Sequence, residues 1–206
     1  MRRSQAPRGK RKGPPSRLGV RDWEIAALEM IGERGVSGLA IEPLARRLGV
    51  TKGSFYWHFS SLDQLLEASL ARWERVFTDG KYGALDERPD PVERLRALFA
   101  DVASGDPALG VFLAFALSDE HPLVRPVFRR VTAKRLRFLA RALRALGLTR
   151  QAAEDRAALL YSAYVGFLQV ARQVPPRQLP VRRRKHLADQ GFRLLVPEAE
   201  KGRPRT

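Results

Sequence analysis

Apolar residues recur every three or four positions along most of the chain, from Trp23 to Leu195. This spacing places them on one face of an α-helix, and no convincing run alternates apolar and polar residues as a β-strand does. Gly and Pro fall at intervals that suit helix ends. The pattern predicts an all-α protein of about nine helices, spanning residues 22–34, 41–48, 52–59, 61–79, 91–104, 107–116, about 122–146, 150–173 and 182–195.

Several of these helices begin at a side chain that can cap free backbone N–H groups. Asp22 is expected to cap the first helix, and Ser60 is expected to open a capping box with Asp63. Thr149 is expected to cap the long helix that ends near residue 173. The next long helix upstream begins at Pro122 or Pro126, since proline fits the first turn of a helix.

Positive charge is concentrated at the N-terminus. The chain of 206 residues has a formal net charge of +16, and residues 1–21 hold eight Lys or Arg side chains and no acid. Because residues 1–20 are also rich in Pro and Gly, they are expected to form a disordered basic arm, and residues 198–206 a flexible tail. Such an arm favours a polyanionic partner, nucleic acid or an anionic membrane surface, although solubility alone would also account for it.

Several classes of protein are disfavoured by what the sequence lacks. Its apolar runs are too short for a membrane span and no secretory signal is evident, so a cytoplasmic protein is expected. The absence of cysteine excludes disulfides, thiolate metal sites and a cysteine nucleophile. The three His residues lie far apart and no common catalytic or nucleotide-binding motif is present. We therefore expect no enzyme, no metal and no cofactor.

The segment from Leu39 to Leu66, LAIEPLARRLGVTKGSFYWHFSSLDQLL, divides into two short helices around a tight break. Gly49 can adopt the left-handed conformation that ends the first helix, and the Thr51 hydroxyl is placed to cap the second. Phe55 and Phe59, four residues apart, share the inner face of that second helix. The two helices are expected to pack on the preceding helix as a helix-turn-helix.

The opposite face of the second helix carries two large aromatic side chains. Such side chains are costly to expose without purpose, and they suit a DNA groove. There the rings pack against sugars and methyl groups while their polar atoms reach phosphates. The residues predicted on this face or at the helix start are Lys52, Gly53, Ser54, Tyr56, Trp57 and His58.

The sequence GVTKGSFYWHF resembles the turn and recognition helix of the TetR family of bacterial transcription regulators, which often reads G-V-[ST]-x-[GP]-[ST]-[LF]-Y-x-[HY]-F. The preceding L-A-x-x-L-G and the following S-x-x-x-L-L match that family's second and fourth helices. The rest of the chain fits the family only by length and helical layout. The resemblance implies a DNA-binding domain at residues 21–66 and a ligand-binding and dimerisation domain at residues 67–197.

The resemblance also implies that the start of the recognition helix approaches bases or phosphates, and that Tyr56 and His58 hold phosphates. Two positions depart from the family pattern: Ala40 stands where a capping Thr is common, and Leu62 where a Lys often contacts phosphate. The basic arm could supply the lost electrostatics by following the minor groove. The implied DNA-contacting set is Thr51, Lys52, Gly53, Ser54, Tyr56, Trp57 and His58, joined by Arg17 and Arg21.

Residues 67–197 carry many apolar side chains, with aromatic ones spread over several helices. Most of these fill the core, but the resemblance implies a cavity for a small effector, and an apolar lining favours an apolar or aromatic one. The last two helices would pair across a two-fold axis to form a homodimer, as the family usually does. The candidate pocket residues are Trp73, Phe77, Phe99, Phe112, Phe115, Tyr161, Tyr164 and Phe167.

These observations predict a repressor, without a membrane partner, that binds a near-palindromic operator in double-stranded DNA and releases it when the effector binds. The helix at residues 61–79 is expected to pivot and change the separation of the two recognition helices. A ligand-independent regulator, a nonspecific architectural DNA binder driven by the basic arm, and activation instead of repression stay open as alternatives.

Overall fold

The computed structural model describes residues 18–104, 107–175 and 177–197, and within these ranges the chain is all-α, as predicted. The predicted basic arm and C-terminal tail lie outside the described residues, apart from Leu18, Gly19 and Val20. No helix in the described ranges is long and apolar enough to cross a membrane. The elements are α1 (Val20–Arg34), the 3-10 turn η1 (Val36–Gly38), α2 (Ile41–Leu48), α3 (Lys52–Tyr56), α4 (Leu62–Glu74), the π-helical turn η2 (Arg75–Gly80), α5 (Lys81–Asp86), α6 (Pro91–Ser104), α7 (Pro107–Ala116), α8 (Val124–Ala145), α9 (Arg150–Gln173) and α10 (Val181–Leu195).

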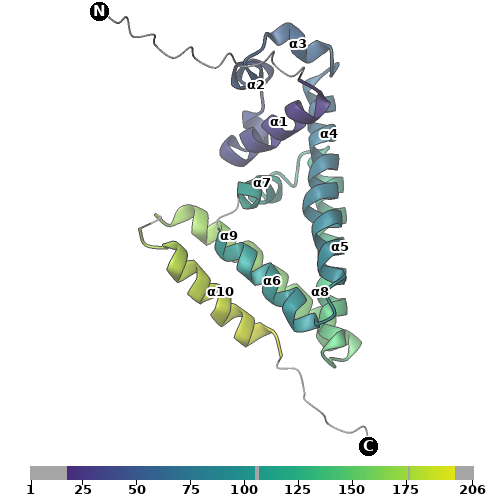
Figure 1. The fold of residues 1–206 in the computed structure, drawn as a ribbon, viewed down its shortest axis with the longest axis vertical. Helices are drawn as coiled ribbons and strands as arrows, with labels where there is room; N and C mark the ends of the chain where they lie inside the picture. The colour runs from purple at the N-terminus through teal and green to yellow at the C-terminus, as the bar shows by residue number, and fades with distance from the viewer. Residues whose placement is uncertain (1–17, 105–106, 176, 198–206) are drawn as a thin grey trace, which may run out of the picture.

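Three of these elements form one continuous rod from Leu62 to Asp86. α4 passes into η2 and then into α5 without a break, and the rod runs down one side of the molecule (Figure 1). The prediction that this helix ends near residue 79 is wrong, because the helix continues through Gly80 and Gly83. With the rod counted as one helix, the described ranges contain nine α-helices, the number that the sequence pattern predicted.

Two predicted helix caps are displaced. α1 begins two residues before Asp22, because the Asp22 carboxylate lies in the first turn and accepts a hydrogen bond from the Gly19 N–H at 2.8 Å. α4 is capped by Ser61 rather than Ser60, since Ser61 Oγ accepts from the Gln64 N–H at 3.1 Å. Gln64 Oε1 in turn accepts from the Ser60 N–H at 2.6 Å. The helix is therefore capped one residue later than predicted, and the reciprocal bond of a capping box to the Ser61 N–H is not formed.

The second helix of the helix-turn-helix is also shorter than predicted. Regular α-helix ends at Tyr56, and residues 57–58 form a turn. The prediction that the Thr51 hydroxyl caps this helix is wrong, because the hydroxyl instead lies 3.3 Å from Ser54 Oγ. The left-handed conformation predicted for Gly49 is confirmed by its φ of 70° and ψ of 29°.

The two longest helices begin close to the predicted residues. α8 begins at Val124, between the two alternatives Pro122 and Pro126. α9 is capped as predicted, because the Thr149 side chain accepts a hydrogen bond from the Ala152 N–H at 3.3 Å.

The first three helices pack around Trp23, which is fully buried. Phe55 of α3 meets the Trp23 ring edge-on, with 5.5 Å between ring centroids, and Phe59 stacks on Phe55 at 5.6 Å. Leu44 and Ala45 of α2 are buried in the same cluster. The predicted inner face of the second short helix, Phe55 and Phe59, is therefore confirmed.

The hydrophobic core runs without interruption past the predicted domain boundary at residues 66 and 67. Leu66, Leu70 and Trp73 of α4 belong to the same buried cluster as the first three helices, and α7 also contributes to it. A second buried cluster joins α5, α6, α8, α9 and α10 at the far end of the molecule. Figure 1 shows α7 between the first three helices and this far end.

α7 crosses α1 at a pair of glycines. A Cβ on Gly110 would lie 3.3 Å from the carbonyl oxygen of Gly32, and a Cβ on Gly32 would lie 3.2 Å from Val111 Cγ2. The missing side chains let the two backbones approach closely. The helix α1 therefore packs directly against α7, so a movement of α7 would displace α1.

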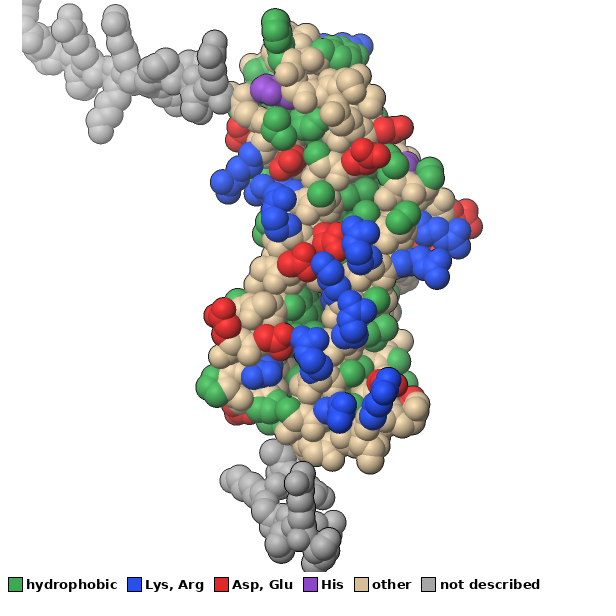
Figure 2. All heavy atoms as spheres, turned by 90° about the vertical axis from the view of Figure 1, so that its right-hand side faces the viewer, with side chains coloured by type: hydrophobic (Ala, Val, Ile, Leu, Met, Phe, Trp, Pro, Cys, Tyr) green, Lys and Arg blue, Asp and Glu red, His purple; other side chains and the backbone are tan. Residues whose placement is uncertain are grey.

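The rod is held to α8 by a nearly buried carboxylate, that of Glu74. Arg130 Nε donates to Glu74 Oε1 at 2.8 Å, and Lys134 Nζ lies 2.9 Å from the same oxygen. The hydrogen bond from Arg130 is the largest of the effects that lower the pKa of Glu74 to about 2. Lys134 also pairs with Asp79 at 2.6 Å. Figure 2 shows Lys and Arg side chains spread over this face, with acidic side chains among them.

Replacing Glu74 with Gln should lower the free energy of unfolding by about 2 kcal/mol at neutral pH, because Arg130 and Lys134 lose their shared partner. A carboxyl group whose pKa is about 2 in the folded state stabilises the fold above its ordinary pKa of 4.5. That stabilisation is lost as the pH falls from 4.5 toward 2. Urea denaturation should therefore show a smaller difference between variant and wild type at about pH 3.5 than at pH 7.

The matched control is Glu154→Gln, since Glu154 pairs with Arg150 on the exposed surface of a single helix. This substitution should change the free energy of unfolding by less than about 0.5 kcal/mol. Equal effects of the two substitutions, or a Glu74→Gln effect that is independent of pH, would contradict the role given to Glu74.

Candidate nucleic-acid interface and internal cavity

At the outer end of the molecule, α3 and the turn after it present two aromatic side chains to solvent. Trp57 is 88% exposed and Tyr56 is 55% exposed. The adjacent Phe55 is fully buried, and its ring contacts that of Tyr56 edge-on at 5.3 Å between centroids. The same short segment thus anchors one aromatic side chain in the core and holds two others outside it.

The other predicted contact residues of this segment differ in exposure. His58 is half-buried, with 6.5 Å between the centroids of its ring and that of Trp23. Its side chain therefore lies against the core and does not project into solvent. Ser54 is half-buried, and Arg21 is exposed on α1. Arg17 lies outside the described residues. The exposed members of the predicted set are Arg21, Thr51, Lys52, Gly53, Tyr56 and Trp57.

Lys52 has an intramolecular partner at this surface. Its Nζ donates to Glu42 Oε1 at 3.1 Å, and both side chains are more than half exposed. The hydrogen bond to Glu42 is the main reason that the pKa of Lys52 is raised. A phosphate that approached Lys52 would have to compete with the Glu42 carboxylate, although water weakens this exposed pair.

The two residues that depart from the family pattern, Ala40 and Leu62, have structural roles in the fold. Ala40 is the N-cap residue of α2 and makes no side-chain hydrogen bond, while its carbonyl accepts from the Leu44 N–H at 3.2 Å. Leu62 is half-buried and packs against the core. Neither side chain offers a donor to a phosphate.

A cavity of about 290 Å³, partly open to the surface, lies in the other half of the molecule. It is lined by η2, α5, α6, α7, α8, α9 and α10, and most of its lining is apolar. Leu98 of α6, Leu139 of α8 and Leu160 of α9 are among these side chains. The structure brings five of the predicted pocket residues together around it: Phe77, Phe99, Tyr161, Tyr164 and Phe167.

The other three predicted pocket residues lie in the closed core. Trp73 and Phe115 are fully buried, with 4.9 Å between their ring centroids, and Phe112 lies 6.5 Å from Trp73. None of the three lines the cavity. The sequence does not distinguish these three core residues from the five cavity residues, because a core position and a cavity position require the same kind of side chain.

Arg135 of α8 is the cavity residue that the sequence analysis missed. Only 4% of it is exposed, and its guanidinium donates to Thr78 Oγ1 at 3.2 Å and to the Phe77 carbonyl at 3.5 Å. A signal was present in the sequence, since Arg135 is four residues after Val131 and four before Leu139, within the apolar stripe of α8. Arg135 is therefore buried together with the apolar residues of the same stripe, Val131 and Leu139.

Two tyrosines share the cavity with Arg135. Burial raises the pKa of Tyr161 and of Tyr164, and the positive charge of Arg135 opposes that rise. Tyr161 is also oriented by Thr132, with 3.1 Å between the two hydroxyl oxygens. Both phenols therefore stay neutral at physiological pH and can donate hydrogen bonds.

A wider groove of about 820 Å³ separates the cavity from the first helix. It lies between α1, α4, η2, α7, α9 and α10. Phe77, Leu109 and Phe167 line both spaces and so form the wall between them. Leu109 precedes Gly110, where α7 crosses α1, so the cavity wall continues into the contact with the N-terminal helices.

In the part of the chain that the structure describes, no three His, Cys, Asp or Glu side chains come close enough together to hold a metal ion. The two sites that stand out are thus the exposed aromatic segment around α3 and the cavity with its buried arginine.

Residues 26–69 match the family model for bacterial regulatory proteins of the tetR family. The chain is 50% identical over 50 residues to the class A tetracycline repressor protein of Escherichia coli. That match covers 22% of this chain and spans 23% of the repressor. The chain spans 22% and 34% of two further curated relatives, so these similarities are confined to a short segment.

Two similarities extend over most of the chain. The HTH-type transcriptional regulator BetI of Burkholderia lata is 30% identical over 144 residues, which are 66% of this chain and 74% of BetI. A protein of Saccharomonospora viridis solved in complex with choline has the same fold, with 20% identity and a TM-score of 0.72. Its match covers 87% of this chain and 98% of that protein. The chain therefore belongs to the TetR family of DNA-binding transcriptional regulators.

Proposed function

We propose that this regulator is a homodimeric repressor that binds a near-palindromic operator and releases it when a small, largely apolar effector enters the cavity between α6, α8, α9 and α10. The observation that carries the proposal is the cavity wall. Phe77 belongs to the rod that runs into the helix-turn-helix, and Leu109 belongs to the helix on which α1 rests. A protein that acts on bacterial DNA in this way would work in the cytoplasm and would need no enzymatic activity.

The DNA-contacting surface proposed is the segment around α3. Trp57 and Tyr56 are exposed, while the buried Phe55 fixes the backbone that carries them. This backbone is therefore already ordered before it contacts a DNA groove. Ordering side chains on binding has an entropic cost that such preorganisation avoids. The proposed contacts are Thr51, Lys52, Gly53, Ser54, Tyr56, Trp57 and His58, with Arg21 of α1 and Arg17 of the basic arm on the flanking backbone.

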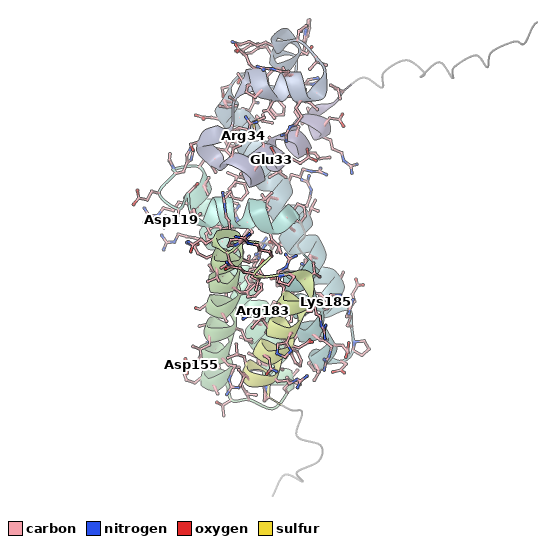
Figure 3. All side chains as sticks on the ribbon, turned by 90° about the vertical axis from the view of Figure 1, so that its left-hand side faces the viewer. Glu33, Arg34, Asp119, Asp155, Arg183 and Lys185 are labelled. Atoms are coloured by element: carbon pink, nitrogen blue, oxygen red, sulfur yellow. The ribbon has the colours of Figure 1, made fainter. Side chains whose placement is uncertain are left out.

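The proposed dimer interface lies on the outer face of α9 and α10. Figure 3 shows these two helices side by side on one face of the molecule. Leu159 is 58% exposed, Val170 is 52% exposed, and the small residues Ala163 and Gly166 lie exposed between them at helical spacing. On α10, Leu194 is 76% exposed. An exposed apolar stripe of this kind suits a four-helix bundle with a second copy of the chain.

Dimerisation gives the geometry that an operator requires. Two recognition helices related by a two-fold axis fit successive major grooves when they are separated by about 34–36 Å. The same symmetry makes the operator near-palindromic. Because each protomer contributes one rod, a change in the angle of the rods changes the separation of the two recognition helices.

The proposed switch uses differential affinity. An effector that fits the cavity better when Phe77 and Leu109 are displaced would shift the population toward a conformer with weaker operator binding. The effect on DNA affinity equals the difference in effector affinity between the two conformers. The structural relative that holds choline supports the idea that proteins of this fold accommodate small ligands.

Replacing Tyr56 with Ala should weaken binding to the DNA upstream of the protein's own gene by roughly tenfold or more, because a groove or phosphate contact is worth about 1–3 kcal/mol. Fluorescence anisotropy with labelled upstream DNA and a shuffled competitor measures the affinity. Circular dichroism and sedimentation should show an unchanged fold and oligomeric state.

The control for this experiment is Leu117→Ala, which truncates a side chain of similar exposure, 59%, just beyond α7. It should leave DNA affinity unchanged. Normal DNA binding by the Tyr56→Ala variant would mean that the recognition face is assigned wrongly.

Replacing Leu159 with Arg should raise the dimer dissociation constant by roughly a hundredfold or more, because the two-fold axis places two like charges in one apolar interface. Sedimentation velocity over a range of protein concentrations measures this constant. Val20→Arg, at a 42% exposed position of α1, is the control and should leave the dimer intact. If both variants sediment like the wild type, the interface lies elsewhere.

A further inference from the structure

Arg135 is a buried cation without an acidic partner. Among the described side chains, no carboxylate forms an ion pair with it, and its hydrogen bonds to Thr78 and Phe77 go to neutral oxygens. Its Nε atom is buried and has no hydrogen-bond partner. Buried charges are normally paired because removing a charge from water is costly. An unpaired one that lines a cavity points to a ligand that supplies the missing charge.

The guanidinium of Arg135 also fills an aromatic cage. Its central carbon lies 4.8 Å from the ring centroid of Phe112, 5.5 Å from that of Trp73 and 5.7 Å from that of Tyr82. Such rings attract a cation, and in many proteins they recognise quaternary ammonium ligands. Here the protein's own arginine occupies that position. A cationic ligand would therefore meet both an occupied cage and a repelling charge.

The remaining lining of the cavity is divided into a polar and an apolar part. Tyr161 and Tyr164 contribute neutral hydroxyl groups beside Arg135, and Lys81 of α5 also lines the cavity. The helices α6, α9 and α10 contribute mainly apolar side chains. With a volume of about 290 Å³, the cavity is at the small end of the range for ligand sites, about 300–1,000 Å³. The lining therefore matches a short molecule with one anionic end and one apolar end.

We propose that the effector is a small amphipathic carboxylic acid whose carboxylate pairs with Arg135 and whose apolar part fills the space between α6, α9 and α10. A guanidinium presents parallel N–H donors that match a carboxylate, and Arg135 lines the cavity. The two tyrosine hydroxyls can donate to the same carboxylate. This inference rests on the proposed function, since it names the chemical class of the effector.

The pairing also gives the effector a route to the DNA-binding helices. Arg135 donates to Phe77 and Thr78, and both residues belong to η2, the π-helical turn within the rod. π-helical turns are rare and often lie at functional sites. A carboxylate that competes for the guanidinium would weaken these two hydrogen bonds. The conformation of η2 would then change, and with it the bend of the rod. Acid binding and operator release are coupled through Arg135 in this scheme.

The test compares three probes that differ only in their polar end: octanoate, octan-1-ol and octyltrimethylammonium. Isothermal titration calorimetry on the full-length protein should show octanoate binding at least roughly tenfold more tightly than the other two probes. In the Arg135→Met variant, which keeps length and loses charge, octanoate affinity should fall by roughly thirtyfold or more while octan-1-ol affinity is retained. Arg135→Lys keeps the charge without the fork of donors and should lie between the two.

Equal affinity for octanoate and octan-1-ol, tighter binding of the ammonium probe, or no measurable binding of octanoate would overturn the proposal. The comparison of probes on the wild-type protein decides this even if Arg135→Met fails to fold, which a thermal melt would reveal. Operator release by octanoate is measured separately by anisotropy. Tight octanoate binding without operator release would contradict the proposed repressor switch while leaving the ligand assignment intact.

Discussion

The unbroken helix from Leu62 to Asp86 is the constraint on which the rest of the structure depends. Its first turns are buried with the helix-turn-helix, and Leu85 near its last turn is buried in the second cluster. The pair between Arg72 and Glu24 ties the rod to α1 at 3.5 Å, with both side chains about one-seventh exposed. Packed cores shift between discrete arrangements rather than deforming smoothly. A displacement at one end of such a rod therefore has to be accommodated at the other.

The charged side chains of α8 have two different roles along that rod. The groups that hold Glu74 are paired, so they fix α8 against the rod. Arg135 has no such partner among the described residues, and an apolar side chain of similar volume would fill its position at lower cost. In the mechanism that we propose, Arg135 serves ligand binding rather than stability. Lys134, which holds Glu74, and Arg135, through which we propose that the rod is released, are neighbouring residues of α8.

The local features of the fold could be predicted from the sequence because short-range chemistry determines them. A glycine that ends α2 with positive φ, a threonine that caps α9, and two phenylalanines four residues apart each act within a few residues of themselves. The errors have equally local causes. Gly80 and Gly83 make the end of the rod look like a terminus, although packing on α8 keeps it helical.

The cavity could be predicted only in part, because it is formed by residues far apart in the chain. An aromatic side chain at helical spacing predicts burial but not whether a hollow adjoins it, so Phe77 and Phe115 could not be told apart. The position of Arg135 within an apolar stripe was readable, yet arginine is almost always placed at the surface. Only the tertiary structure shows that the guanidinium of Arg135 is buried.

We propose that sequence-specific DNA recognition resides in the helix-turn-helix and not in the basic arm. The most direct measurement compares binding to the DNA upstream of the protein's own gene with binding to shuffled DNA, at several salt concentrations, for the full chain and for the chain without residues 1–17. We expect a preference for the native DNA that survives removal of the arm, with a reduced dependence of affinity on salt. Equal binding to both DNAs, lost when the arm is removed, would contradict it.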